Sequence, residues 1–151
     1  MKAFPHVYAV AATGTGEGRI TVSADGLPAL ETAAPAEFDG PGDAWSPETL
    51  LVAAVTACFI LTFRAVARAG RLDWTAIECS TEGVLERPSA VTQFSRFETR
   101  VTLTVPTGTD HAKAAALLER AEKSCLVANS LRGERKLEIR LVDGPLPAAP
   151  G

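Results

Sequence analysis

Residues 45–70 read WSPETLLVAAVTACFILTFRAVARAG, and this stretch decides the fold. Ser46 supplies a hydroxyl for a helix N-cap, Pro47 suits the first helical position, and Glu48 places an acid where the helix dipole favours one. Apolar residues then recur at intervals of three and four as far as Val66, and Gly70 provides a stop. The stretch therefore predicts one long helix whose first turns are apolar nearly all round.

A helix that is apolar on most sides is normally covered by protein on more than one face. The longest apolar run, residues 50–63, is interrupted by Thr56 and Thr62 and is shorter than the roughly 20 residues that a bilayer requires. We therefore expect a buried helix and no membrane partner. A partner subunit is one way to cover the faces that a single small sheet leaves open.

Two regions of alternating polar and apolar residues, 77–86 and 97–105, predict strands, and a third follows at 136–142. A hairpin is expected from residues 6–12 and 19–22, and the Gly-rich stretch 13–18 between them lacks the Gly-Lys-Ser/Thr ending of a phosphate cradle. Asp110 begins a second, amphipathic helix that ends near Ser124, and a short helical turn is expected within 127–131. These elements predict an α+β fold in which both helices pack on an antiparallel sheet. We expect one domain over residues 1–143 and a flexible tail over 144–151.

The composition excludes several classes of protein. The 151 residues are 46% hydrophobic and 22% charged, as in soluble globular chains. Fifteen Lys and Arg against eighteen Asp and Glu give a net charge of −3, which provides no field for neutralising nucleic-acid phosphates. The chain begins without the pattern of a signal peptide, so the expected location is the cytoplasm.

The three cysteines, Cys58, Cys79 and Cys125, match neither a secreted disulfide framework nor a Cys-x-x-Cys spacing. For Cys58, in an apolar helix, the simplest interpretation is a small core residue, and Cys79 at an inward strand position is expected to be structural. Cys125 lies at a junction between helical segments, where backbone N–H groups of the next turn favour a thiolate. The two histidines, His6 and His111, have no metal-ligand spacing.

Two segments resemble the OsmC/Ohr family of thiol peroxidases: WSPETLL at 45–51, continuing to Ala-Cys-Phe at 57–59, and CLVANSLRG at 125–133. The resemblance covers nearly the whole chain in element order. It implies reduction of organic hydroperoxides, with Cys58 attacking the peroxide and Cys125 resolving the product as a disulfide. It also implies an intertwined homodimer with active sites at the subunit boundary and a dithiol reductant such as a lipoylated protein. Such chemistry requires no metal or bound cofactor.

Glu48 matches the family's glutamate, which orients an arginine over the reactive sulfur. Ten residues separate Glu48 from Cys58, so on one helix the two lie roughly 15 Å apart. Two interpretations of Glu48 remain. It serves the site across the dimer, or it only complements the helix N-terminus.

The arginine itself departs from the family pattern, because the positions nearest to it here hold Glu17 and Glu37. Arg19 is the candidate substitute, which a hairpin slip or bulge would bring to the sulfur; the alternative is a solvated surface arginine. Arg64 and Arg132 are weaker candidates. The family's usual proline after the second cysteine is replaced by Leu126.

Leu51, Val55 and Phe59 form an apolar wall on the predicted helix, which favours an alkyl hydroperoxide over hydrogen peroxide. A second interpretation is a non-catalytic module of the same fold that binds a lipid or another small ligand. The charged stretch 132–136 is interpreted as a solvated start of the last strand.

Overall fold

The computed structural model describes residues 1–146 and 148–149 and divides into two compact units, 1–51 and 52–151. The prediction of a single domain over residues 1–143 stays a prediction.

The first unit contains a small antiparallel sheet in the order β1-β2-β3, built from β1 (Ala11–Thr13), β2 (Ile20–Ser23) and β3 (Leu30–Thr32). The expected hairpin is present, but its first strand is shorter and begins later than predicted, because residues 6–10 have no strand partner. A 3₁₀ turn, η1 (Ala36–Phe38), forms in the connection that follows β3.

The long helix α1 (Pro47–Ala69) begins as the sequence predicts. The Ser46 hydroxyl accepts a hydrogen bond from the Thr49 N–H at 3.2 Å, and the Thr49 hydroxyl accepts one from the Ser46 N–H at 2.9 Å. These reciprocal bonds satisfy two backbone donors at the helix start. The helix is longer than the apolar run within it, and by length and composition alone it could cross a membrane. Core helices of soluble proteins have the same length and composition.

The second unit is built on a three-stranded sheet in the order β4-β5-β6. Its strands are β4 (Ala76–Glu86), β5 (Gln93–Pro106) and β6 (Glu134–Gly144). β4 and β5 pair antiparallel, but β5 and β6 pair in parallel from Arg96 opposite Glu134 to Pro106 opposite Gly144. The predicted α+β class is confirmed, but the prediction of an antiparallel sheet is wrong for the pairing of β5 with β6. The connection from β5 to β6 contains two helices, and such a long crossover returns the chain in the same direction.

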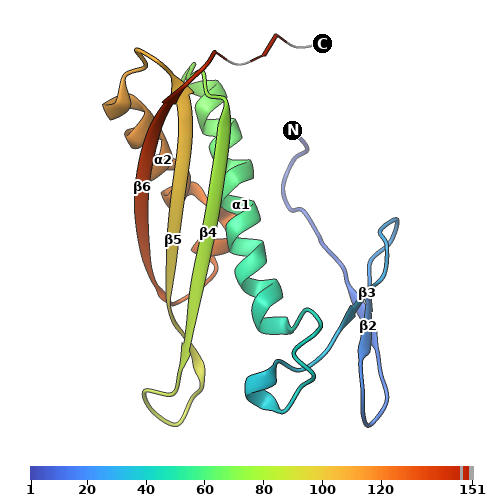
Figure 1. Cartoon of the computed structure of the whole chain (residues 1–151). Helices are drawn as coiled ribbons and strands as arrows, with labels where there is room; N and C mark the ends of the chain where they lie inside the picture. The colour runs from blue at the N-terminus through green and yellow to red at the C-terminus, as the bar shows by residue number, and fades with distance from the viewer. Residues whose placement is uncertain (147, 150–151) are drawn as a thin grey trace. The chain divides into compact units, whose positions relative to one another are not determined.

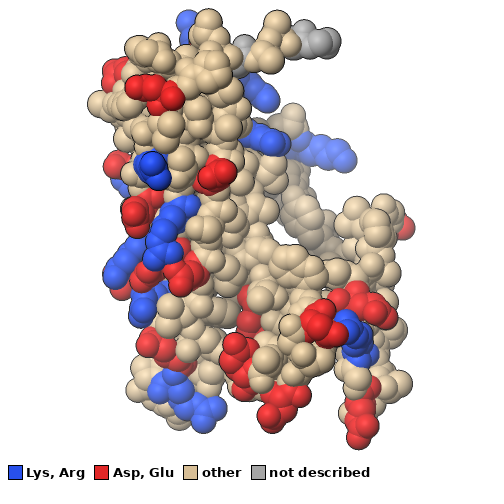
Figure 2. Space-filling view, in the orientation of Figure 1, with Lys and Arg blue, Asp and Glu red and all other residues tan. Residues whose placement is uncertain are grey.

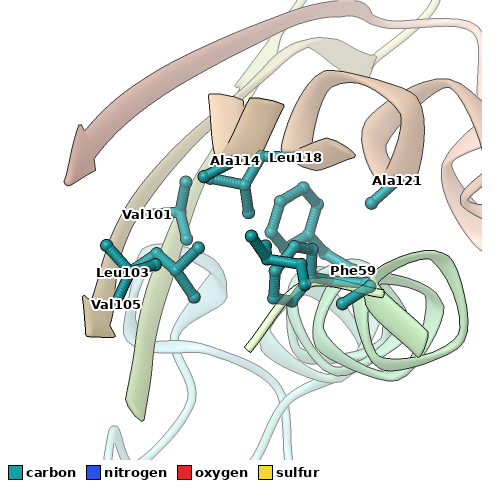
Figure 3. Packing of buried hydrophobic residues seen from close by; sticks show 10 residues of the cluster. Phe59, Val101, Leu103, Val105, Ala114, Leu118 and Ala121 are labelled. Carbon is teal, nitrogen blue, oxygen red and sulfur yellow. The ribbon is translucent and has the colours of Figure 1, made fainter. Parts of the chain in front are cut away.

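Those two helices are α2 (His111–Ser124) and α3 (Leu126–Asn129). Asp110 caps α2 as predicted, because its carboxylate accepts a hydrogen bond from the Lys113 N–H at 3.1 Å. α1 and α2 lie on one face of the sheet (Figure 1), and their buried side chains meet those of β5 in one core (Figure 3). Members of this core include Phe59, Phe63, Val101, Leu103, Ala114, Leu118 and Ala121.

The opposite face of the sheet carries charges of both signs, which Figure 2 shows interleaved over the strands. Arg100 of β5 forms ion pairs with Glu82 of β4, Glu98 of β5 and Glu138 of β6. One face is therefore apolar and covered by helices, while the other is charged and solvated, as the alternation of the strands predicts.

The last strand ends at Gly144, one residue beyond the predicted domain boundary. The Pro145 carbonyl accepts a hydrogen bond from the Thr75 hydroxyl at 2.9 Å. Within the predicted tail, residues 147, 150 and 151 lie outside the described residues. Its flexibility stays a prediction.

Candidate active site

Two of the three cysteines meet in the second unit. Cys58 lies on α1 beside a buried stripe formed by Val55, Phe59, Phe63 and Ala67, and its own side chain is half-buried. Cys125 lies between the end of α2 and the start of α3 and is only 1% exposed. The two thiols lie close enough for each to shift the pKa of the other, although 67 positions separate them in the sequence.

The Cys58 sulfur is surrounded by hydrogen-bond donors. The backbone N–H groups of Leu126 and Val127, at the start of α3, are near enough to lower the pKa of Cys58, and the Thr62 hydroxyl lies 3.8 Å from the sulfur, one helical turn along α1. Burial opposes ionisation of this thiol, but the hydrogen bonds from Val127, Cys125, Thr62 and Leu126 outweigh it. The pKa of Cys58 is therefore lowered from its ordinary value, because hydrogen bonds to the sulfur stabilise the thiolate.

Cys125 has the opposite character. Its burial, reinforced by the neighbouring Cys58, raises its pKa to about 11, although the N–H groups of Ala128 and Val127 act in the other direction. The sequence analysis predicts that N–H groups of the following turn favour a thiolate at Cys125. These groups do lie at this junction, but the cysteine whose pKa is lowered is Cys58. Cys125 is held as a thiol and donates its proton toward Cys58.

Cys79 lies on the inward side of β4 and packs against the core. Burial, and after it the nearby Cys125, raises the pKa of Cys79 to about 11. No hydrogen-bond donor lowers it among the described groups that act on this thiol. A neutral core thiol is what the sequence predicts for this position.

Val55 and Phe59, predicted to contact substrate, are only 4% and 2% exposed. They line a cavity of about 10 Å³ together with Cys125, Phe97 and Thr99. That volume is barely enough for one water molecule. Within one chain these two residues therefore form the wall behind Cys125 rather than the surface of an open groove. Leu51, the third member of the predicted wall, is half-buried at the end of the first unit.

Glu48 and Arg19, the other predicted site residues, belong to the first unit. The Nη2 atom of Arg19 donates to both carboxylate oxygens of Asp43, each at 2.9 Å, so this guanidinium already forms an ion pair. Glu48 lies in the first turn of α1, and its Oε2 atom is buried without a hydrogen-bond partner among the residues that the structure describes. The weaker candidates Arg64 and Arg132 are exposed.

The groups with the largest effects on the pKa of Cys58 are burial and hydrogen-bonding groups, and none of these carries a positive charge. Sequence analysis missed Thr62, although its four-residue spacing from Cys58 places both on one helix face. Over the described residues, no group of three His, Cys, Asp or Glu side chains is placed to hold a metal ion.

Comparisons with known proteins agree with the fold. Residues 40–140 match the family described as "OsmC-like protein". The chain is 31% identical over 141 residues to an organic hydroperoxide resistance protein of Xanthomonas axonopodis pv. citri, covering 89% of this chain and 94% of the relative.

Two solved structures share the architecture. An OsmC-like protein of unknown function from Vibrio cholerae superposes with a TM-score of 0.81 at 19% identity, covering 89% of this chain and 99% of the other. A structure from Legionella pneumophila, described as an organic hydroperoxide resistance protein OsmC and predicted redox protein, has a TM-score of 0.69 at 26% identity. That match covers 93% of this chain and 98% of the other.

Proposed function

Because this chain belongs to the OsmC-like protein family, we propose that it is a thiol peroxidase that reduces organic hydroperoxides with Cys58 and Cys125. One observation carries the proposal. Cys58 and Cys125 lie close enough for each thiol to shift the pKa of the other, and the pKa of Cys58 is lowered while that of Cys125 is raised to about 11. A peroxidatic cysteine must be a thiolate, whereas its resolving partner is best kept protonated until needed.

In the first step the Cys58 thiolate attacks the terminal oxygen of the hydroperoxide. An S–O bond forms, the O–O bond breaks, and the alkoxide takes up a proton and leaves as the alcohol. The sulfur is oxidised to sulfenic acid while the hydroperoxide is reduced. The N–H groups of Leu126 and Val127 support this step, because they stabilise the attacking anion without carrying a charge.

In the second step Cys125 attacks the Cys58 sulfenic acid. The S–S bond forms, the hydroxyl group leaves, and the Cys125 proton completes a water molecule. A dithiol reductant, such as a lipoylated protein, then restores both thiols by two exchange reactions and becomes a disulfide itself. This cycle fits a reducing compartment, so we place the protein in the cytoplasm.

The open side of Cys58 favours an alkyl substrate. Leu61, one turn further along α1, is 60% exposed, so the surface next to the half-buried sulfur is apolar. An alkyl chain would be bound by burial of its hydrocarbon, which hydrogen peroxide lacks. Leu51 would extend this surface, and Val55 and Phe59 would support it from behind.

We also propose a homodimer. Only Val55, Phe59, Phe63 and Ala67 of the long apolar helix are buried within the chain, which leaves much of its apolar surface for a second copy. The Oε2 of Glu48 is buried and unpaired within the chain, so this carboxylate would have to turn outward to accept a hydrogen bond from a partner subunit. Under this proposal Glu48 orients a cation across the dimer, and Arg19 would have to leave Asp43 to be that cation. Light scattering after size-exclusion chromatography would contradict the dimer if it gave the 15.8 kDa mass of one chain at micromolar concentration.

The main experiment treats the reduced protein with one equivalent of cumene hydroperoxide. We expect two of the three thiols to disappear, and peptide mass spectrometry to find the disulfide between Cys58 and Cys125. With hydrogen peroxide the same reaction should be much slower. Retention of all three thiols would contradict the proposed peroxidase. Equal rates with both peroxides would contradict its preference for organic hydroperoxides.

A ligand-binding module of the same fold is the second candidate, and it is favoured because none of the groups with the largest effects on the pKa of Cys58 is a cation. The pH dependence of Cys58 alkylation separates the two functions. A peroxidase requires a Cys58 pKa well below that of a free thiol, whereas a module with incidental thiols has no such requirement.

A further inference from the structure

Arg135 is the second residue of β6, and its side chain turns toward the inside of the molecule. It is in phase with Leu137, Ile139 and Leu141, whose side chains pack against the core. Its backbone is held in register opposite Phe97 of β5. A charged residue at an inward strand position requires partners, because a half-buried guanidinium loses water. The interpretation of 132–136 as a wholly solvated stretch is therefore wrong for Arg135.

Arg135 finds its partners on both sides of Cys125. Its Nε lies 2.8 Å from Oε1 of Glu122 in the last turn of α2, and its Nη1 donates to Oδ1 of Asn129 at 2.8 Å at the end of α3. The Arg135 and Glu122 side chains are only 26% and 21% exposed, so water screens this ion pair less than it screens the pairs on the outer face of the sheet.

The two partners are themselves bonded to the junction. The Glu122 carbonyl accepts a hydrogen bond from the Cys125 N–H at 3.3 Å, and the Asn129 N–H donates to the Cys125 carbonyl at 2.9 Å. The Asn129 side-chain amide also donates to the Lys123 carbonyl at 3.1 Å. The Arg135 fork thus joins β6 to the end of α2 and to the end of α3, with Cys125 between them.

This junction sets the direction of the backbone groups that reach Cys58. α3 has only four residues, too few to be stable by itself, so its orientation depends on what holds its ends. We propose that Arg135 is a positioning residue, which clamps α2 and α3 so that the N–H groups of Leu126 and Val127 face the Cys58 sulfur. This inference rests on the proposed function for its importance to catalysis, but its test does not.

The test measures the pH dependence of iodoacetamide labelling at Cys58, read from its own peptide by mass spectrometry, in the reduced full-length protein. In Arg135→Met we expect the pKa of Cys58, obtained from the labelling profile, to rise. A rise of one in this pKa corresponds to a roughly tenfold loss of thiolate at neutral pH. Arg140→Met is the matched control, because Arg140 lies on the same strand but is exposed on the outer face. Its labelling profile should equal that of the wild type.

Two further variants separate positioning from direct charge. Arg135→Lys keeps the positive charge but loses the planar fork, so it should behave nearly like Arg135→Met. Asn129→Ala removes one arm and leaves the ion pair with Glu122, so it should produce a smaller rise in the same direction. If Arg135→Met does not fold, Asn129→Ala tests whether the clamp on α3 sets the pKa of Cys58.

The proposal is overturned if Arg135→Met or Asn129→Ala labels like the wild type, or if lysine at position 135 restores the profile fully. None of these results depends on hydroperoxide turnover. Failure of the peroxidase proposal would instead appear as unreactive thiols in a wild-type protein whose labelling profile still responds to Arg135.

Discussion

Cys58 and Cys79 are both partly buried thiols in the second unit, yet their surroundings give them opposite chemistry. Cys58 faces two backbone N–H groups, a thiol and a hydroxyl, which lower its pKa in spite of burial. Cys79 packs on the core side of β4, where burial and the nearby Cys125 raise its pKa to about 11.

The comparison shows that burial alone does not decide whether a cysteine is reactive. Desolvation is the largest single influence on both thiols and raises the pKa of each. Hydrogen-bond donors make the difference. The first N–H groups of a helix have no partner within the helix and can bond to a nearby sulfur, whereas the N–H groups between paired strands bond to the neighbouring strand.

Exchanging each of these two cysteines for serine should give the largest contrast. Cys58→Ser should lose hydroperoxide reduction by more than about a hundredfold, because a serine hydroxyl stays protonated at neutral pH. Cys79→Ser should retain the wild-type rate, since that thiol is neutral and takes no part in the proposed cycle. Consumption of cumene hydroperoxide with dihydrolipoamide as reductant measures both. Equal loss of activity in the two folded variants would remove the distinction between the thiols.

Alkaline pH should reveal Cys79 through stability. Its unfolded thiol ionises near pH 8.5, whereas its folded pKa is about 11, so its contribution to stability is complete below pH 8.5 and is lost as the pH rises toward 11. These two pKa values correspond to a loss of about 3 kcal/mol by pH 11. Because the thiol is only partly buried and water screens it, we expect the reduced wild type to lose roughly 2 kcal/mol more of its free energy of unfolding than Cys79→Ala. Urea denaturation at pH 8 and pH 11 provides the measurement.

Any other group that ionises in this range is present in both proteins, so its contribution largely cancels in the comparison. Parallel curves for the wild type and Cys79→Ala would mean that the thiol of Cys79 is already ionised, or accessible to water, in the folded protein.

The smallest expected effect is at Thr62, whose hydroxyl lies 3.8 Å from the Cys58 sulfur. Thr62→Val keeps the side-chain shape and removes one hydrogen bond of about 0.5 kcal/mol, so the thiolate fraction of Cys58 should fall roughly twofold. Thr56→Val is the matched control, because its hydroxyl donates to the Val52 carbonyl at 2.8 Å one turn earlier on the same helix. A larger shift in Thr56→Val than in Thr62→Val would contradict this assignment.

The elements that the sequence predicts well are those with local signals. Ser46 and Asp110 cap their helices as expected, because a capping hydroxyl or carboxylate needs only the N–H groups three residues further on. The alternation in β4, β5 and β6 correctly separates core-facing from solvent-facing residues, since a strand always presents successive side chains to opposite faces.

The direction of β6 escaped prediction, because a period of two is the same in parallel and antiparallel strands. Arg135 was missed for a related reason. The alternation that predicts Leu137, Ile139 and Leu141 as inward residues also makes Arg135, two residues before Leu137, an inward residue. Its charge, however, favours an exposed position. Only the carboxylate of Glu122 and the amide of Asn129 make an inward arginine favourable.

The sequence alone determined the long apolar helix, the caps, the alternating strands and the family, because these depend on neighbours within a few residues or on motifs read directly. Which thiol is acidic was decided by the tertiary structure. The N–H groups of Leu126 and Val127 act on a cysteine of another helix. Their direction depends on Arg135 of β6, so it cannot be predicted from the residue spacing within either segment.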